Sequence, residues 1–194
     1  MAGATVVPID DAKRAREASL LARAQRGEDA AFEQLVRPHL SMMRRVANRM
    51  GSAVLAEDVV QEALLIASQR LSDYQAGTRL GSWLAAIVSR RAVTLSRGQF
   101  RRARREATAA STGELPATPE QLVRGLQASE RVAAALQSLP AKRREAAILR
   151  FDAAMSYAEI AQALDTSEAS CRVLVYLAVK ALKSELSDLL SENK

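Results

Sequence analysis

The segment SYAEIAQALDTSEASCRVLVYLAVKAL, residues 156–182, decides the fold of this chain. Ser156 and Glu159 have the spacing of a capping box, which predicts that a short helix begins after Ser156. Asp165–Ser167 has the polar composition of a turn, and the apolar residues beyond it recur at helical spacing. A capped short helix, a tight turn and a longer helix predict a helix-turn-helix over residues 156–183.

The rest of the second half is predicted to be helical as well. A capping box that begins at Thr118 marks a helix start, with Pro119 at the first helical position. Pro140 restarts the chain into another helix, which carries Phe151 among its apolar residues. No alternating strand pattern is found, so the predicted fold class is all-α.

A change of composition divides the chain into two small helical domains. Residues 106–118, EATAASTGELPAT, are small and polar and contain a proline, which indicates a flexible linker. The domains on either side are predicted over residues 19–105 and 119–190. Residues 1–18 lack a clear apolar periodicity, and we expect them to form a flexible tail.

The first domain begins with a helical pattern that a proline interrupts. Apolar residues recur at helical spacing from Ala30, and Pro38 falls within the run. Because the residue before a proline avoids the helical conformation, we expect a boundary near Arg37. Gly51 is then expected to end the helix.

Two further helices complete the first domain. Glu57 and Asp58 lie near the start of the first of them, where acidic side chains complement the helix dipole. Residues 72–81 contain two glycines and are expected to form a loop. Ser82 then caps the next helix, in which we interpret Trp83 as a core residue. That helix leads into an arginine-rich tract.

The composition excludes several kinds of site. The chain has one Cys and one His, so it can form neither an internal disulfide nor a zinc cluster. No apolar run approaches the roughly 18 residues of a membrane span, and the charged N-terminus does not resemble a signal peptide. We therefore expect a cytoplasmic chain without membrane insertion, metal or cofactor. The acids, His39 and Cys171 form no convincing catalytic arrangement, so we expect no enzyme activity.

Charge is distributed unevenly along the chain. Residues 1–105 carry 18 Lys and Arg against 10 Asp and Glu, a net charge of +8. Residues 106–194 carry 10 against 12, a net charge of −2. A basic half favours a polyanionic partner such as nucleic acid, because lysine and arginine release counterions from phosphates.

The order and spacing of the motifs resemble the extracytoplasmic-function (ECF) sigma factors of the bacterial sigma-70 family. The resemblance covers residues 19–190 and is carried by FEQLV (32–36), AEDVVQEAL (56–64), WLAAI (83–87), LQSLP (136–140) and SYAEIAQAL (156–164). It implies sigma region 2 in the first half and sigma region 4 in the second. The implied function is to bind core RNA polymerase and to direct promoter recognition and opening.

The resemblance also implies roles for individual residues. The polymerase-docking groups would be Asp58, Gln61 and Glu62. The groups near the opened −10 element would be Tyr74, Arg79, Arg90, Arg91, Thr94, Arg97 and Arg101, with the arginines contacting phosphates rather than reading bases. Weak contacts to −35 DNA would come from Ser170, Arg172, Tyr176, Lys180 and Lys183.

The sequence departs from the family pattern at two places. Arg90 and Thr94 stand where the family usually has Asn and Asp, so the polar pair associated with strand separation is altered. In the last helix, Leu174, Leu177 and Val179 stand at positions that are usually basic. This helix therefore offers few donors to DNA, and its apolar residues outside the core suggest a protein contact.

Three functions remain open from the sequence. The favoured one is a sigma factor that fires promoters, with core polymerase, promoter DNA and an anti-sigma factor as partners and a monomeric state outside its complexes. The second is a sigma-like module that binds polymerase or an anti-sigma factor without firing promoters. The third is a helix-turn-helix repressor, although neither a dimerisation element nor a basic recognition helix is evident.

Overall fold

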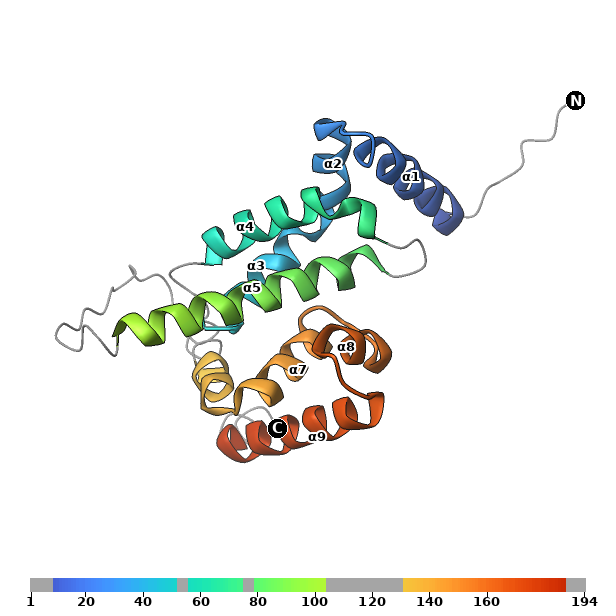
Figure 1. Cartoon of the computed structure of the whole chain (residues 1–194). Coiled ribbons are helices and arrows are strands. Elements are labelled where there is room, and N and C mark those ends of the chain that lie inside the picture. Colours follow the sequence, from blue (N-terminus) through green and yellow to red (C-terminus); the bar gives the residue numbers. More distant parts are fainter. Residues whose placement is uncertain (1–8, 52–55, 75–78, 104–130, 188–194) are drawn as a thin grey trace, which may run out of the picture.

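The computed structural model describes residues 9–51, 56–74, 79–103 and 131–187, and all regular elements in these ranges are helices. Figure 1 shows two groups of helices that pack on one another, with α5 lying across the second group. We call the described residues 9–103 the first unit and residues 131–187 the second unit. The predicted all-α fold class is confirmed.

The first unit consists of five α-helices and two short 3-10 turns among its described residues. They are α1 (Ile9–Ala24), α2 (Asp29–Val36), η1 (Arg37–His39), α3 (Leu40–Arg49), α4 (Ala56–Gln69), η3 (Leu71–Asp73) and α5 (Leu80–Ala103). The second unit has a helical stretch over residues 131–138 and three labelled helices, α7 (Ala141–Phe151), α8 (Tyr157–Leu164) and α9 (Glu168–Glu185).

Two helix boundaries in the first unit follow local sequence signals, one at a proline and one at a glycine. The 3-10 turn η1 separates α2 from α3 at Pro38, where the proline has no backbone donor, so the boundary falls where it was predicted. The stated reason was wrong, because Arg37 keeps a right-handed helical conformation, with φ of −48° and ψ of −45°. The chain after α3 passes through Gly51 with φ of +93°, a conformation that glycine adopts without a Cβ clash. The predicted boundary near Arg37 and the predicted stop at Gly51 are therefore confirmed.

Two predictions for the first unit are wrong. A helix, α1, begins at Ile9 inside the stretch of residues 1–18 that we expected to be a tail. α1 packs against α2, and Leu20 is its buried anchor, so tertiary contact supplies what the weak apolar pattern did not indicate. The last long helix of this unit begins at Leu80, so Ser82 lies within its first turn and is not its cap.

The helix-turn-helix of the second unit is confirmed in detail. The amide of Glu159 donates to Ser156 Oγ over 3.2 Å, and the amide of Ser156 donates to Glu159 Oε2 over 2.7 Å, which completes the capping box. Asp165 ends α8 in the left-handed conformation, with φ of +50°. Ser167 then caps α9, because its Oγ accepts from the amide of Ser170 over 3.1 Å.

The cores of the two units are continuous. The apolar cluster of the first unit, which includes Met43, Val59 and Leu84, extends to Leu139 and Ile148 of the second unit. The second unit has its own cluster around the helix-turn-helix, and it takes in the fully buried Ala85 of α5. The central helix α5 therefore packs on both sides, and the small side chain of Ala85 lets the second unit approach closely.

Phe151, which we placed among the apolar residues of its helix, is 62% exposed. The linker over residues 106–118 and the capping box at Thr118 lie outside the described residues. No helix in the described ranges is long and apolar enough to cross a membrane. The same ranges hold no group of three His, Cys, Asp or Glu side chains that could bind a metal ion.

The left-handed conformation of Ala154 in the second unit leads to a prediction about stability. Ala154 is exposed and has φ of +51°, a left-handed conformation that costs a residue with a Cβ about 1 kcal/mol or more. We expect Ala154→Gly to raise the free energy of unfolding by about 0.5–1 kcal/mol. The exposed Ala158 inside α8 is the matched control, because Ala158→Gly should lower it by a similar amount. Urea denaturation measures both, and a destabilised Ala154→Gly variant would contradict the prediction.

Candidate functional site

The three residues predicted to dock on the polymerase lie on α4, but they differ in their surroundings. Asp58 and Gln61 are exposed, whereas Glu62 is partly buried and forms an ion pair with Arg91 of α5. This pair ties α4 to α5 next to Gln61. Asp58 and Gln61 are therefore the accessible members of the predicted docking set.

The start of α4 is fixed by a second ion pair. Arg44 of α3 donates to both carboxylate oxygens of Glu57, over 3.0 and 3.2 Å. The hydrogen bond from Arg44 lowers the pKa of the Glu57 carboxyl, and burial opposes this shift. Glu57 is thus held against α3, and the side chain of Asp58 next to it is exposed.

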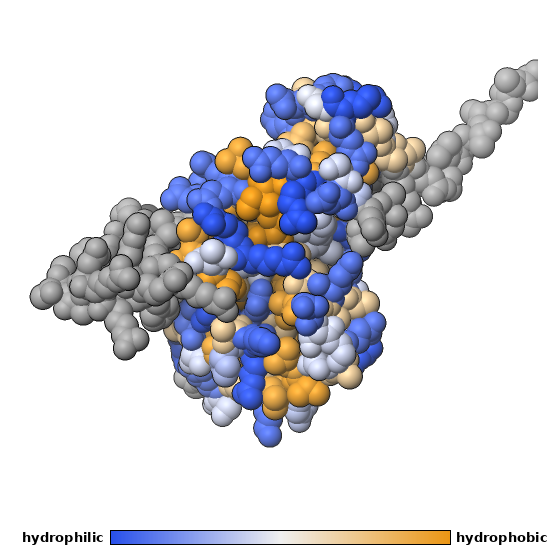
Figure 2. All heavy atoms as spheres, in the orientation of Figure 1, coloured by the Kyte–Doolittle hydropathy of each residue, from blue (hydrophilic) through white to orange (hydrophobic). Residues whose placement is uncertain are grey.

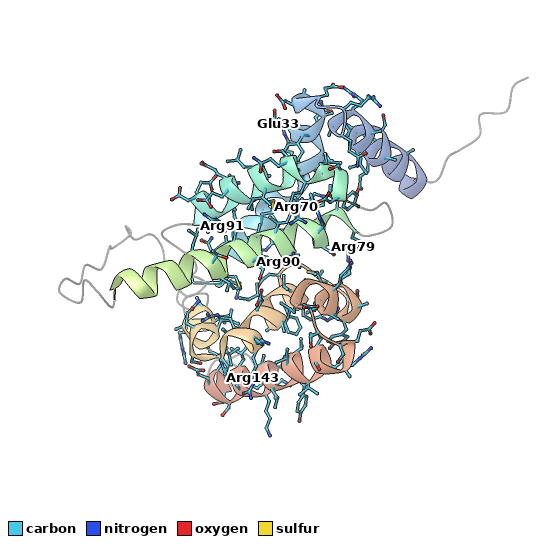
Figure 3. All side chains as sticks on the ribbon, viewed as in Figure 1. Glu33, Arg70, Arg79, Arg90, Arg91 and Arg143 are labelled. Atoms are coloured by element: carbon cyan, nitrogen blue, oxygen red, sulfur yellow. The ribbon has the colours of Figure 1, made fainter. Side chains whose placement is uncertain are left out.

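The arginines predicted to contact the opened −10 strand do not form one cluster. Figure 3 shows Arg79 and Arg90 on the side of α5 that faces the second unit, and Arg91 between α4 and α5. The guanidinium of Arg79 donates to the carbonyl of Ala154 over 3.1 Å. That of Arg90 donates to the carbonyl of Ala163, also over 3.1 Å. Two of the predicted phosphate contacts are therefore engaged with the chain's own second unit.

The remaining residues of the predicted −10 site have mixed placements. Tyr74 is buried, and its ring centroid lies 5.4 Å from that of Trp83 in a tilted arrangement. Trp83 is partly buried and packs against the core, in agreement with our interpretation. Thr94 is exposed and donates its hydroxyl to the Arg90 carbonyl over 2.8 Å. Arg97 and Arg101 lie in the last part of α5, where side chains are outside the described residues.

Two buried serines of α5 contact acids of the second unit. Ser82 Oγ donates to Glu159 Oε1 over 2.6 Å, and Ser89 Oγ donates to Glu145 Oε1 over 2.5 Å. Burial alone would raise the pKa of the Glu159 carboxyl, but hydrogen bonds from Ser82 and Ser156 together hold it below its usual value. We expected Ser82 to cap a helix, but its hydroxyl donates instead to Glu159, which lies 77 positions away in the sequence.

Two arginines of the first unit contact the turn between α7 and α8. Arg49 Nε lies 3.1 Å from Asp152 Oδ1, and the guanidinium of Arg45 donates to the Asp152 carbonyl over 3.4 Å. Burial raises the pKa of the Asp152 carboxyl, while Arg49 and Arg45 lower it by less. The sequence reasoning missed these contacts, since neither the spacing nor the composition of these residues connects α3 with this turn.

A hollow lies along the seam between the two units. It has a volume of about 250 Å³, and its lining includes Trp83, Arg90, Met155 and Glu159. Pockets that bind small molecules usually measure roughly 300–1,000 Å³. The hollow is thus a gap in the packing of α5 against α8 rather than a ligand site.

The recognition helix α9 presents both cations and apolar side chains. Arg172 stacks over the ring of Tyr157, with its guanidinium carbon 4.6 Å from the centroid, and Arg150 covers the same ring at 4.9 Å. Lys180 and Lys183 are exposed, and Ser170 lies in the first turn beside the cap. The predicted weak −35 residues therefore lie on one helix, but only three of them are cations.

The apolar residues of α9 divide between the core and the surface, but the three at usually basic positions are partly buried rather than exposed: Leu174, Leu177 and Val179. Of these, Leu174 and Val179 pack against the cluster of the second unit. Cys171, Val175 and Ala178 are buried. Val173 is 56% exposed and Tyr176 is 66% exposed. Figure 2 shows apolar side chains reaching the visible surface of the second unit among polar ones. The outer face of α9 thus offers contacts of the kind that proteins make to proteins.

Comparisons with known proteins agree with this architecture. The family described as Sigma-70 region 2 matches residues 35–106, and the family described as Sigma-70, region 4 matches residues 129–182. The first match covers α3, α4 and α5 of the first unit, and the second covers the helix-turn-helix.

Similar proteins are found among curated relatives and solved structures. The ECF RNA polymerase sigma factor BldN of Streptomyces coelicolor is 30% identical over 93% of this chain and 70% of its own length. The ECF RNA polymerase sigma-E factor of Escherichia coli K12 is 27% identical over 88% of this chain and 94% of its own length. The sigma factor RpoE of Bartonella quintana, solved with the anti-sigma factor NepR, superposes with a TM-score of 0.66 at 25% identity, covering 80% of this chain and 96% of that one. Both sigma regions are matched in order, and a relative that is 30% identical aligns with 93% of this chain, so this chain belongs to the ECF sigma factors of RNA polymerase.

Proposed function

We propose that this sigma factor docks on core RNA polymerase through the exposed face of α4 and holds the opened −10 strand along α5. The observation that carries the proposal is the outward position of Asp58 and Gln61 on a helix that an ion pair fastens to the arginine-bearing α5. Docking and strand binding would then use neighbouring helices of one rigid unit. No covalent chemistry is proposed, because the factor acts by binding.

The −10 contacts are proposed to be mainly electrostatic. Arginines supply charge to phosphates whatever the base sequence, and Arg79 and Arg90 lie on one side of α5. Tyr74 is buried against Trp83, so its proposed contact with a base would require that ring to leave the core. The arginines are for this reason the stronger part of the proposed −10 site.

The second unit is proposed to bind −35 DNA weakly and a protein more strongly. Its recognition helix carries Arg172, Lys180 and Lys183, but Val173 and Tyr176 occupy much of the exposed surface between them. A face of this kind suits the polymerase or an anti-sigma factor. An anti-sigma partner is also supported by the Bartonella quintana RpoE structure, which contains one. The proposed location is the cytoplasm, where polymerase and promoters are found.

The apolar face of α9 also supports the alternative of a sigma-like module that binds partners without firing promoters. Transcription in vitro with purified core polymerase on a library of randomised promoters distinguishes the two functions. A promoter-firing factor enriches a shared −10 sequence among the transcribed templates. Polymerase binding without any factor-dependent transcript would favour the alternative.

The first prediction from the proposed function concerns docking on the polymerase. We expect Asp58→Arg to weaken binding to core polymerase by at least tenfold, since it places a cation where the docking surface offers an acid. Exposed substitutions change stability by under about 0.5 kcal/mol, so folding should be retained. Glu33→Arg on α2 makes the same charge change at another exposed acid and is the control. Equal co-purification of both variants with core polymerase would refute the assignment.

The arginine side of α5 makes the second prediction. If Arg90 contacts a phosphate, Arg90→Ala should reduce the slope of log affinity against log salt by roughly 0.7–0.9 for holoenzyme on a pre-melted promoter. Arg37→Ala, at an exposed arginine of η1, should leave the slope unchanged. A slope that Arg90→Ala does not alter would indicate that Arg90 serves only the contact with Ala163.

The outer face of α9 makes the third prediction. We expect Val173→Asp to weaken binding to the polymerase flap or to an anti-sigma factor more than it weakens −35 protection in a holoenzyme footprint. Ala169→Asp is the control, because it adds the same charge at an exposed position of the first turn of the same helix. Loss of strong −35 protection in Val173→Asp, with partner binding intact, would show that this face reads DNA.

A further inference from the structure

A large pocket lies where α1, η1, α3 and the first residues of α5 meet the turn between α7 and α8. Its volume is about 990 Å³, far above the 250 Å³ of the hollow beside Trp83. Pockets that bind small molecules usually measure roughly 300–1,000 Å³. This pocket is therefore large enough for an organic ligand.

The floor of the pocket is apolar. Leu20, Leu35 and Leu80 line it, and they are only 8%, 3% and 2% exposed. Met42, which packs against the same core cluster, lines it as well. Because these side chains belong to the core of the first unit, the floor is already in place before a ligand binds. We call the three leucines the apolar floor.

The rim of the pocket is basic. Glu17 and Asp152 contribute two negative charges to the lining, against four positive charges, so the lining has a formal net charge of +2. Arg49 pairs with Asp152 from outside the pocket, which offsets one of these acids. The four cations are arginines, all exposed, and we call them the rim arginines: Arg16, Arg37, Arg45 and Arg79.

The rim arginines have donors to offer a ligand. A guanidinium carries five N–H donors. Arg79 uses one of them for the carbonyl of Ala154 over 3.1 Å, and Arg45 uses one for the carbonyl of Asp152 over 3.4 Å. Arg16 makes no hydrogen bond or ion pair with another side chain in the described part of the chain. Most of the donors at the rim are therefore left for an anion.

An apolar floor below a ring of guanidinium groups indicates the chemistry of the ligand. Guanidinium groups bind phosphate oxygens in charge-assisted hydrogen bonds, often two at a time. A nucleoside di- or triphosphate carries several such oxygens at one end and a less polar nucleoside at the other. Its base and ribose can cover the leucines while its phosphates reach the arginines. Inorganic phosphate would leave the apolar floor exposed to water.

Most of the rim lies away from the helices of the proposed promoter and polymerase contacts. Arg16 belongs to α1, Arg37 to η1 and Arg45 to α3, whereas only Arg79 is shared with the proposed −10 site. A strand held along α5 has no need of the other three. The arrangement of the rim consequently favours a separate, compact anion over a continuation of the strand path.

We propose that this pocket binds a nucleoside di- or triphosphate. The phosphates lie among the rim arginines, and the nucleoside covers the apolar floor. The inference does not rest on the proposed promoter contacts, since it uses none of the polymerase-docking residues and shares only Arg79 with the −10 site.

A series of ligands tests the chemical class. Calorimetric titration of the full-length chain, at constant ionic strength, compares AMP, ADP, ATP and tripolyphosphate. We expect affinity to rise roughly tenfold or more from AMP to ATP, because each added phosphate gains charge-assisted hydrogen bonds. Tripolyphosphate should bind roughly tenfold more weakly than ATP although it carries more charge, because it has no nucleoside to cover the apolar floor.

Two rim arginines outside the proposed DNA and polymerase sites supply the variants. Arg16→Ala and Arg45→Ala should each weaken ATP binding by roughly tenfold. Both positions are exposed, so folding should be retained, and thermal unfolding without nucleotide checks this. Arg23→Ala on α1 and Arg44→Ala on α3 are the matched controls, because each removes an arginine of the same helix that does not line the pocket. The controls should bind ATP as the wild type does.

Methyl signals of leucine report on the floor directly. In the chain labelled with carbon-13 at its leucine methyl groups, ATP should shift the signals of Leu20, Leu35 and Leu80, because an adenine ring above them alters the local magnetic field. Leu136 and Leu139 lie outside the lining and should not shift. Tripolyphosphate has no ring and should leave the signals of the floor almost unchanged.

Each possible result decides a part of the proposal. Equal affinities for AMP and ATP, or wild-type affinity for ATP in both Arg16→Ala and Arg45→Ala, would overturn the phosphate site. Tripolyphosphate that binds as tightly as ATP, with unshifted floor leucines, would refute the nucleoside. A short oligothymidine strand that binds more tightly than ATP, and loses affinity in the same two variants, would identify a nucleic acid as the occupant instead. Since Arg16 and Arg45 belong to neither proposed site, these results leave the proposed promoter function to its own tests.

Discussion

The close packing of the second unit against α5 is the contact on which the described arrangement depends. It is possible because the residues of α5 at the contact are small: Ser82, Ala85 and Ser89 are all nearly or fully buried. A larger side chain at Ala85 would overfill a closely packed interior and force the helices apart. With the distance between the units set in this way, Arg79 and Arg90 reach backbone carbonyls of the second unit.

The same helix thus serves two purposes that make different demands on sequence. Its inner side must be apolar, which Leu84 and Val88 satisfy within the core of the first unit. Its other side must be compatible with the second unit and, in the proposed function, with a phosphate backbone. Serine and alanine, with arginine on either side, meet both requirements. The small residues allow close contact, and the guanidinium groups donate to carbonyl and to phosphate oxygens alike.

Sequence reasoning succeeded where the cause of a structure lies within a few residues. The capping box of Ser156 and Glu159, the interruption at Pro38 and the turn that begins at Asp165 are of this kind, and all three were foreseen. Ser82 shows where such reasoning fails, since its hydroxyl bonds to Glu159 rather than to its own helix. The early start of α1 at Ile9 was missed for a related reason, because that helix is stabilised by α2 more than by its own pattern.

For the candidate site, the sequence and the family resemblance predict that the functional residues lie on or beside α4, α5 and α9. They could not foresee that Arg90 and Arg91, adjacent in sequence, would turn to different partners, since the direction of a side chain depends on which helices surround it. The assignment of Asp152, Arg45 and Arg49 to a common contact required coordinates for the same reason.

The continuity of the two cores has a thermodynamic meaning of its own. Leu139 and Ile148 are buried partly by residues of the first unit, and Ala85 is buried by residues of the second. Neither unit can therefore unfold without exposing apolar surface of the other. While the two units are packed together, thermal unfolding is expected to be cooperative across both. If the two units were apart, this coupling would be lost, and each would be expected to unfold in a transition of its own. Whether the chain unfolds in one step or two thus depends on whether its two units are packed together, and not only on the fold of each unit.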